Sequence, residues 1–511
     1  MDSLRLSIPE QHNYTDPTVE RDVVRLHNWL TNLPLMDVVE TVRLVHGALD
    51  ALNEQKLPVK QRFQYLEEYR ATAQRLFVTV DPLHLRQLAL NKQQRQEAID
   101  GVEQLFLSMA GGYKLIVVEL YQASGEGTPD ALFGHAINRT LEQLGYSLLD
   151  SYRFYRAVQP QLIAESHQLY RLARHQGLLG SCVDEDDEHA PAPAASISML
   201  YHTSMLLSLT DPFRLAEGEV SLLFDVLMQH VARCRIIPGN SWTGSGEGLF
   251  LVELGSDRLP IPCNTLQPPV KASDPYLLDA TAVLSAVRER LAKTPAKVRM
   301  QSPEAMVLRR LLPEAQGVDK RSEQRHADSR WVSLLLGVSD IHQHLVRAAR
   351  KEPERIASES SAEPITCRVL DSSEKGIKLA WDGCGAGDAR VGDLLGIMEQ
   401  QGGRSSLTLA MIRSIRIYRE GGMEAGVQLM PGGLGPVTCH LTEQPDKIGV
   451  RALFMPANEA EQFTATLVAA KGLYEEGRRL LIDVGGREVK ARAGRRVLDS
   501  PVFDRFEFSA E

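Results

Sequence analysis

The strongest constraint in this sequence is a change of hydrophobic periodicity near Pro313. Before this residue, apolar side chains recur at three- and four-residue spacing, as Val42, Val45, Leu49 and Leu52 do, which is typical of helices with one buried face. After it, short apolar runs alternate with glycine-containing turns, which is typical of antiparallel strands. The sequence therefore predicts a multidomain α+β protein, in which an α-helical amino-terminal region is followed by a carboxy-terminal antiparallel β-barrel with extra β structure.

The region before Pro313 divides into three parts. We expect an α-helical domain over residues 1–181. Besides the segment that contains Val42 and Leu52, its clearest amphipathic runs are Val59–Phe77, Arg86–Met109 and Pro129–Leu172. Residues 182–196 are acidic and then rich in proline and alanine, so they cannot bury enough apolar surface to fold alone and are interpreted as a linker or loop. Residues 197–315 are predicted to mix helices with a β-hairpin that turns at Gly255-Ser256-Asp257.

Ten strand candidates follow Pro313. They are Trp331–Val338, Ile365–Leu370, Ile377–Trp381, Asp393–Met398, Ser406–Tyr418, Ala425–Met430, Val450–Phe454, Thr464–Ala470, Arg479–Val484 and Phe506–Phe508. One segment among them, Ser339–Arg350, has the pattern of a helix capped by Ser339. The spacing predicts a small antiparallel barrel over residues 316–441 and a β extension over residues 442–511.

The charge balance limits the partners of the chain. With 57 Lys+Arg against 66 Asp+Glu, the 511 residues carry a formal charge of -9, which disfavours nucleic acid or an anionic lipid surface as a partner. Any anion must therefore bind at a local basic cluster. The sequence has no signal-peptide pattern and no apolar run near the roughly 20 residues of a membrane span, so we expect a cytoplasmic protein with no membrane span.

Motifs of catalysis and metal binding do not stand out. The six cysteines are scattered without a Cys-x-x-Cys pair, which predicts buried reduced thiols and no metal site. Neither a Gly-x-Ser-x-Gly elbow nor a His-Glu-x-x-His pair is found. The sequence therefore predicts no catalytic residues and no cofactor, and we interpret the chain as a protein that is not an enzyme.

The most informative residues form two pieces. Arg321 and Arg325 lie four residues apart on an arm before the strand that begins at Trp331, and arginine can pair with phosphate or with the O6/N7 edge of guanine. The second piece, Asp371-Ser-Ser373-Glu-Lys-Gly376, joins two strand candidates and offers a carboxylate acceptor, a small hydroxyl and a permissive glycine. If the two pieces meet, they form a clamp for a purine nucleotide.

Simpler explanations compete with this one. Arg321 and Arg325 also fit a solvated charged linker, and Asp371 and Ser373 also fit an ordinary turn, because Asp, Ser and Gly favour turns for local reasons. The spacing Arg-x-x-x-Arg recurs at Arg21/Arg25 and Arg492/Arg496 and is a weak signal alone. The 45 residues 326–370 also separate the two pieces, and an insert of this length can displace the arm.

At these residues the sequence resembles the PilZ family of cyclic-di-GMP receptors. That family has Arg-x-x-x-Arg on an arm before its first barrel strand and Asp/Asn-x-Ser-x-x-Gly after its second. The resemblance covers residues 320–440 and implies a PilZ-like β-barrel that binds cyclic-di-GMP without turning it over. It also implies the ligand-binding residues, which are Arg321, Arg325, Asp371, Ser373 and Gly376. The long helical region suggests FimW-type PilZ proteins, which are linked to surface attachment by type IV pili.

Three hypotheses of function follow. The favoured one is a cyclic-di-GMP-binding effector that couples the level of this second messenger to a protein partner, in the pilus or motility machinery that serves surface attachment and biofilm formation. The alternative is a ligand-free PilZ-like scaffold that mediates protein–protein contacts. A third hypothesis is an enzyme of nucleotide metabolism with its active site in the helical region, which a pocket with perturbed titratable groups would favour.

Overall fold

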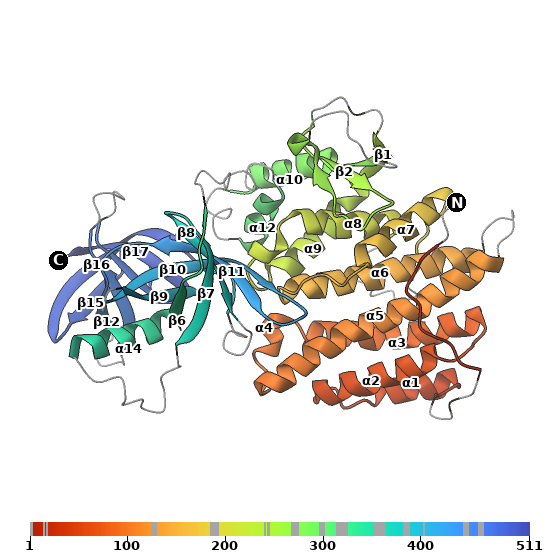
Figure 1. Ribbon diagram of the computed structural model, residues 1–511, viewed down its shortest axis with the longest axis horizontal. Helices are drawn as coiled ribbons and strands as arrows, with labels where there is room; N and C mark the ends of the chain where they lie inside the picture. Colours follow the sequence, from red (N-terminus) through yellow and green to blue (C-terminus); the bar gives the residue numbers. More distant parts are fainter. Residues whose placement is uncertain are drawn as a thin grey trace. The chain divides into compact units, whose positions relative to one another are not determined.

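The computed structural model shows a helical unit and a β-rich unit (Figure 1). Unit 1 comprises Met1–Pro212 and Glu217–Lys320, and unit 2 comprises Phe213–Ala216 and Arg321–Glu511. The structure describes residues 4–511 except 14–15, 17–18, 124–129, 184–193, 240–241, 243–245, 267–274, 296–301, 313–324, 351–363, 382–388, 402–403, 443–448 and 458–463.

Unit 1 is built mainly from α-helices. They are α1 Val23–Thr31, α2 Val38–Asn53, α3 Val59–Thr79, α4 Pro82–Leu85, α5 Lys92–Ala123, α6 Ala131–Arg153, α7 Leu162–His175, α8 Ile197–Leu209, α9 Glu219–His230, α10 Thr281–Lys293 and α12 Pro303–Leu311. Several begin at a side chain that accepts a backbone N–H, as Asp37 does for α2 and Ser196 for α8. The predicted stripe of α2 is buried, with Val45 and Leu49 at 0% exposure.

The run Pro129–Leu172 is not one helix. It divides into α6 and α7, and the residues between them include Tyr155 with φ 55° and Gln161 with φ 65°. A left-handed backbone at a non-glycine residue cannot continue an α-helix. The sequence pattern does not reveal the boundary between α6 and α7, because both helices bury an apolar face and the hydrophobic periodicity continues from one to the other.

A small antiparallel sheet follows the helices of unit 1. Its strands are β1 Arg235–Pro238, β2 Leu249–Glu253, β3 Ile261–Pro262 and β4 Pro275–Asp279, in the order β1-β4-β2-β3. The pairs Phe250↔Pro262 and Leu251↔Ile261 confirm the predicted hairpin. Short 3-10 turns lie at η1 Pro212–Arg214, η2 Val231–Arg233 and η4 Cys263–Thr265.

Unit 2 begins with a closed barrel. Its strands are β6 Trp331–Leu336, β7 Ile365–Ser372, β8 Gly376–Trp381, β9 Leu394–Gln401, β10 Arg404–Ile417 and β11 Met423–Met430, with the short β5 His326–Ala327 added on β7. The order β7-β6-β9-β10-β11-β8 closes because β8 also pairs with β7. All these pairings are antiparallel.

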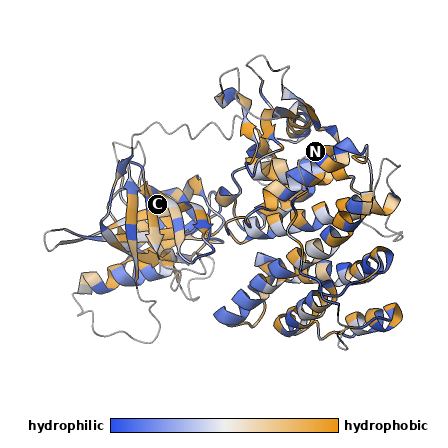
Figure 2. Ribbon diagram, turned by 45° about the vertical axis from the view of Figure 1, so that its right-hand side comes forward, coloured by the Kyte–Doolittle hydropathy of each residue, from blue (hydrophilic) through white to orange (hydrophobic). Residues whose placement is uncertain are grey.

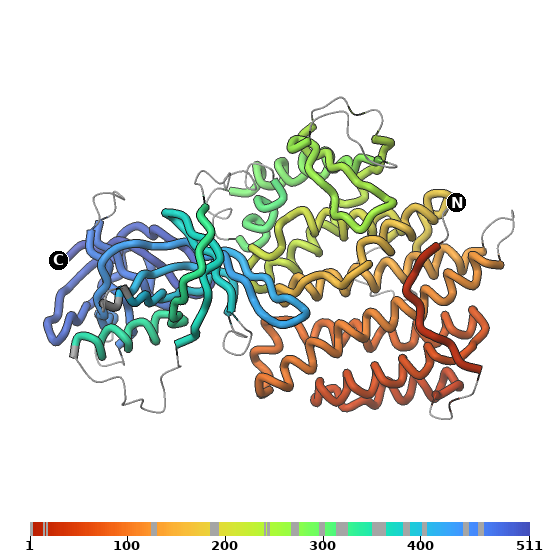
Figure 3. The backbone as a smooth tube through the Cα atoms, in the orientation of Figure 1, coloured from red at the N-terminus to blue at the C-terminus, as the bar shows by residue number. Residues whose placement is uncertain are grey.

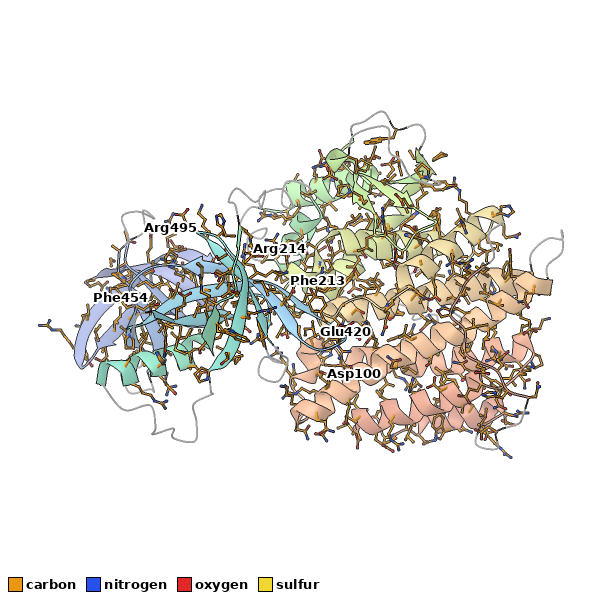
Figure 4. The ribbon with its side chains drawn as sticks, in the orientation of Figure 1. Asp100, Phe213, Arg214, Glu420, Phe454 and Arg495 are labelled. Carbon is orange, nitrogen blue, oxygen red and sulfur yellow. The ribbon has the colours of Figure 1, made fainter. Side chains whose placement is uncertain are left out.

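A second closed barrel follows, with the order β12-β13-β14-β17-β16-β15. Its strands are β12 Gly435–Leu441, β13 Val450–Met455, β14 Thr466–Ala470, β15 Arg479–Val484, β16 Arg487–Asp499 and β17 Phe503–Ala510. Figure 3 traces this barrel as the last part of the chain, and Figure 4 labels its Phe454 and Arg495. The predicted fold class is confirmed, and the expected extra β structure is this second six-stranded barrel.

The two barrels share part of one core through α14 Gly337–Arg350. Ile341 of α14 is 0% exposed and belongs to one cluster with Leu409 of the first barrel and Leu453 of the second. The predicted helix Ser339–Arg350 is thus confirmed, with its start at Gly337. Hydrophobic and hydrophilic residues alternate along α14 in Figure 2, because a helix packed on one side keeps its other side polar.

Unit 2 includes Phe213–Ala216, and the guanidinium carbon of Arg416 lies 4.5 Å from the centroid of the Phe213 ring. Among the described residues, no helix is long and apolar enough to cross a membrane.

Candidate functional site

The arm that carries Arg325 pairs with the end of β7. In β5, His326 pairs with Ser372 and Ala327 pairs with Asp371. Beyond β5, the N–H of Asp328 donates to the carbonyl of Leu370 at 3.1 Å, and the N–H of Val369 donates to the carbonyl of Arg330 at 2.9 Å. The backbone of the arm is therefore fixed along β7.

This pairing brings the two predicted pieces together at Arg325 and Asp371. The Nη1 of Arg325 donates to the Oδ1 of Asp371, and the two side chains are 34% and 29% exposed. An ion pair with this exposure adds little stability, because water screens both charges. The ion pair instead orients both side chains, so that the donor groups of Arg325 and the acceptor oxygens of Asp371 lie at one place on the surface.

The insert between the two pieces does not separate them. Its described parts are the arm, β6, α14 and most of β7, and residues 351–363 lie outside the described residues. Because β6 pairs antiparallel with β7, the chain leaves the site along β6 and returns along β7 to Asp371. The two ends of the insert therefore meet at the ion pair.

Ser373 and Gly376 form the turn that follows Asp371. Both the backbone N–H and the Oγ of Ser373 donate to the carbonyl of Gly376, at 2.8 and 3.2 Å. A Cβ added at Gly376 would lie 2.7 Å from the carbonyl oxygen of Val427 and 3.9 Å from Nη2 of Arg325. Glycine is needed here because β8 lies close to β11, and no left-handed backbone is involved.

Four residues outside the predicted site support the arm, namely Asp328, Arg330, Ser372 and Glu399. Ser372 donates to Asp328 at 3.2 Å, and Arg330 contacts both Asp328 at 2.7 Å and Glu399 at 3.3 Å. The backbone N–H of Arg330 and, more weakly, the charge of Arg330 hold the pKa of Asp328 below its usual value. The close spacing of Asp328 and Arg330 in the sequence could have indicated an ion pair on the arm. Their contacts to Ser372 and Glu399 could not be predicted, because they depend on strand pairing.

A β-bulge directs Asp371 to the outer face of the barrel. The register of β7 against β8 shifts between Val369 and Asp371, so Asp371 lies opposite Lys378. Lys378 contacts Glu424 at 2.7 Å. Burial acts to raise the pKa of Glu424. Hydrogen bonds from Lys378 and Tyr418, together with the positive charges of Lys378 and Arg416, outweigh this effect and lower the pKa. The outer face beside Asp371 thus carries an ordered set of charges.

The remaining predicted site residue, Arg321, lies outside the described residues, as does Lys320. The other Arg-x-x-x-Arg pair of unit 2 has a structural environment. Arg492 contacts Glu511 at 2.9 Å, and Arg496 contacts Asp499 at 2.9 Å and lies 5.4 Å from the Tyr474 ring. Position beside the acceptor turn, and not spacing alone, distinguishes Arg325.

A pocket in unit 1 bears on the enzyme hypothesis. Its volume is about 510 Å³. It is lined by His230, Arg233, Ala286, Glu289, Arg290, Lys293, Thr294 and Pro295. Asp150 of the helices is fully buried, and burial raises its pKa to about 7, but it does not line this pocket. Within the pocket, burial and the charges of Arg290 and Arg233 lower the pKa of His230. The pocket therefore carries one titratable group with a perturbed pKa, whereas the enzyme hypothesis requires a cluster of them.

Among the described side chains, no group of three or more His, Cys, Asp or Glu residues is placed to hold a metal ion. Cys234, Cys263, Cys367 and Cys439 are buried free thiols, and Cys182 is partly exposed. Burial raises the pKa of Cys367 to about 12, which makes this thiol a weak nucleophile. Cys384 lies outside the described residues.

The six-stranded barrel with an arginine arm at its acceptor turn defines a PilZ-domain protein. Residues 346–433 match the family described as "Cyclic-di-GMP receptor FimW, middle PilZ domain". Residues 24–239 match "Cyclic-di-GMP receptor FimW, N-terminal domain", and residues 439–510 match "FimW C-terminal beta-barrel domain". The chain belongs to the FimW family of cyclic-di-GMP receptors.

One relative aligns along the whole chain. It is the "Cyclic-di-GMP receptor FimW" of Pseudomonas aeruginosa, 25% identical over an alignment of 582 residues that spans 100% of this chain and 94% of the relative. The resemblance found in the sequence is thereby confirmed. Asp371, Ser373 and Gly376 fall within the matched PilZ range, whereas Arg321 and Arg325 precede it.

Proposed function

We propose that this chain binds cyclic-di-GMP through Arg321, Arg325, Asp371, Ser373 and Gly376. The observation that supports the proposal most is the contact between Arg325 and Asp371 beside the turn of Ser373 and Gly376. This contact joins residues that are 46 positions apart in the sequence. Membership in a family of cyclic-di-GMP receptors identifies the ligand that such a site would take.

The chemistry of guanine fits this pair. A guanidinium can donate two parallel hydrogen bonds to the O6 and N7 acceptors of guanine, and a carboxylate can accept from the ring N–H and amino donors of guanine. Arg325 and Asp371 present these complementary groups side by side. The negative phosphates of the ligand are attracted by Lys320, Arg321, Arg325 and Arg330, although the whole chain carries a charge of -9.

In this proposal the ligand controls a protein partner. The arm joins unit 1 to the first barrel, so a ligand that contacts Arg321 and Arg325 also restricts the link between the units. Such a restriction acts as a switch if the ligand binds the two arrangements of the link unequally. We propose that the chain is a cytoplasmic effector, not an enzyme, whose partner belongs to the pilus or motility machinery of surface attachment.

Isothermal titration of the intact chain with cyclic-di-GMP tests the ligand. We expect saturable binding at micromolar or lower concentration, and a loss of at least about tenfold in affinity for Arg325→Ala and for Asp371→Ala, because each removes a charged hydrogen-bonding group. Arg492→Ala is the matched control, since it changes the same motif in the second barrel and should leave the affinity unchanged.

The same titration separates the alternative. A wild-type chain that gives no heat at several temperatures would exclude the receptor role and favour a ligand-free scaffold. Binding that persists unchanged in both variants would place the ligand elsewhere. The insert of residues 326–370 no longer favours the scaffold, because both of its ends lie at the site.

A further inference from the structure

An exposed tryptophan lies close to the candidate site. Trp331 is the first residue of β6, and 67% of its surface is exposed. Large apolar side chains on a strand are more often covered, because each exposed ring costs hydrophobic free energy. Across the ladder, Trp331 pairs with Arg368 of β7, which is also exposed. No ion pair or hydrogen bond of the Arg368 guanidinium is found within the described part of the chain.

Trp331 and Arg368 lie on the same face of the barrel as Asp371. Residues directly opposite each other in a ladder point to the same side, and residues two apart on one strand do so as well. Arg368 lies opposite Ala380, and Asp371 lies opposite Lys378, two residues away on β8. The spacing of three on β7 would normally place Arg368 and Asp371 on opposite faces, and the bulge between Val369 and Asp371 corrects it.

The separation of these residues suits one ligand with two bases. Three residues along a strand span about 10 Å, and the bulge shortens this distance. The ladder is continuous from the arm to β6, since the N–H of Val369 donates to the carbonyl of Arg330 next to Trp331. The outer face therefore presents an ion pair at one position and an aromatic ring beside a guanidinium at the next.

We infer that Trp331 is a further ligand-contact residue, which stacks its indole on a purine ring of the bound cyclic dinucleotide while Arg368 pairs with a phosphate. This inference rests on the function proposed above and adds to it a stacking surface. An indole is a favourable platform for any base, and a neighbouring arginine adds an attraction for the ligand's negative charge. A stacked ligand would also cover the exposed ring.

The test compares Trp331→Ala and Trp331→Phe with the wild-type chain, using calorimetric titration with cyclic-di-GMP and tryptophan fluorescence. We expect Trp331→Ala to weaken binding about tenfold or more and Trp331→Phe to weaken it less, because phenylalanine keeps a smaller ring for stacking. The wild-type fluorescence should change on titration, and Trp331→Phe should lose most of this change. Trp29, Trp242 and Trp381 remain in Trp331→Phe, so the response of this variant measures their shared contribution to the signal.

The outcomes distinguish this inference from the function on which it rests. Equal affinities for the wild type and Trp331→Ala, with an unchanged fluorescence response in Trp331→Phe, would overturn the stacking role while the ligand site at Arg325 stands. Absence of binding by the wild type would overturn both. Arg368→Ala should weaken binding several-fold, less so at high salt, where phosphate contacts count for less.

Discussion

Arg325 and Asp371 give the candidate site its chemical character, and the residues around them give it its position. Asp328, Ser372 and Glu399 hold the arm through contacts that do not involve Arg325 itself. In the proposed function, the ligand therefore meets a donor and an acceptor whose backbones are already fixed. Preorganisation of this kind lowers the entropy cost of binding, because fewer groups must be ordered by the ligand.

Replacing Arg325 by lysine separates charge from geometry. Arg325→Lys keeps one positive charge but loses the planar fork, so we expect cyclic-di-GMP affinity to fall roughly tenfold, less than for Arg325→Ala. Equilibrium dialysis with the ligand measures both variants. If lysine restored the wild-type affinity, Arg325 would act through charge alone and the proposed contact with a guanine edge would be wrong.

Gly376 should be intolerant of a side chain for a steric reason. A Cβ at this position would approach the carbonyl oxygen of Val427 to 2.7 Å, and backbone cannot move aside easily. We expect Gly376→Ala to lower the free energy of unfolding of unit 2 by about 1–3 kcal/mol, as measured by denaturant titration. Gly435→Ala is the matched control, because its added Cβ would meet only Phe454 at 3.9 Å. Equal stabilities of the two variants would refute the steric explanation.

Asp150 should make the stability of unit 1 depend on pH. Burial raises its pKa to about 7, against an opposing effect of the Arg153 charge, whereas an unfolded aspartate has a pKa near 4. Between these values the folded chain holds a proton that the unfolded chain has lost, so the contribution of Asp150 to stability falls as pH rises from about 4 to 7.

Asp150→Asn removes this titration. The stability lost by the wild type between pH 5 and pH 8 should shrink in the variant by an amount on the order of 1–3 kcal/mol, measured by denaturant unfolding at both values. An identical pH dependence in both proteins would show that Asp150 does not titrate in this range. The sequence offered no sign of this group, because its burial depends on how the helices pack.

At the scale of elements, α14 joins the two barrels. Ile341 is fully buried in the cluster that contains Leu409 and Leu453. We expect Ile341→Ala to destabilise unit 2 by about 2–5 kcal/mol, because it leaves a cavity between three elements. Ala349→Ser, on the exposed side of the helix, should change stability by less than about 0.5 kcal/mol. Thermal unfolding of both variants decides, and a small effect of Ile341→Ala would mean that α14 does not hold the barrels.

Local patterns predicted most elements but not their pairing. All ten strand candidates overlap strands of the structure, whereas β5, β12 and β16 were missed. In β16 the inward positions carry small residues, such as Ala491 and Ala493, between charged ones, so its hydrophobic signal is weak. The closure of each barrel depends on the register between distant strands, which no local pattern encodes.

The candidate site shows the same division between local and tertiary information. The residue types of Arg325 and Asp371 could be selected from the sequence, because their chemistry suits a nucleotide. Their contact could not be predicted, since it requires β5 to pair with β7 across the insert of residues 326–370. The bulge that aligns Arg368 and Trp331 with Asp371 was equally hidden.

At the scale of the whole molecule, one stretch of chain serves two purposes. The main segment of unit 2 begins at Arg321, so the arm that carries the candidate ligand residues is also a covalent link between the helical unit and the barrels. The matched amino-terminal family range, residues 24–239, lies within unit 1 except for Phe213–Ala216. In the proposed function, a ligand bound at the arm therefore acts on this link between the units.

A comparative titration tests whether this chain recognises guanine in a cyclic dinucleotide. Calorimetry of the intact wild-type chain with cyclic-di-GMP and with cyclic-di-AMP should give saturable binding of the first and at least about tenfold weaker binding of the second, because adenine lacks the ring N–H donor that Asp371 would accept. Equal binding of both would exclude recognition of guanine by Asp371, and no binding of cyclic-di-GMP would exclude the proposed receptor function.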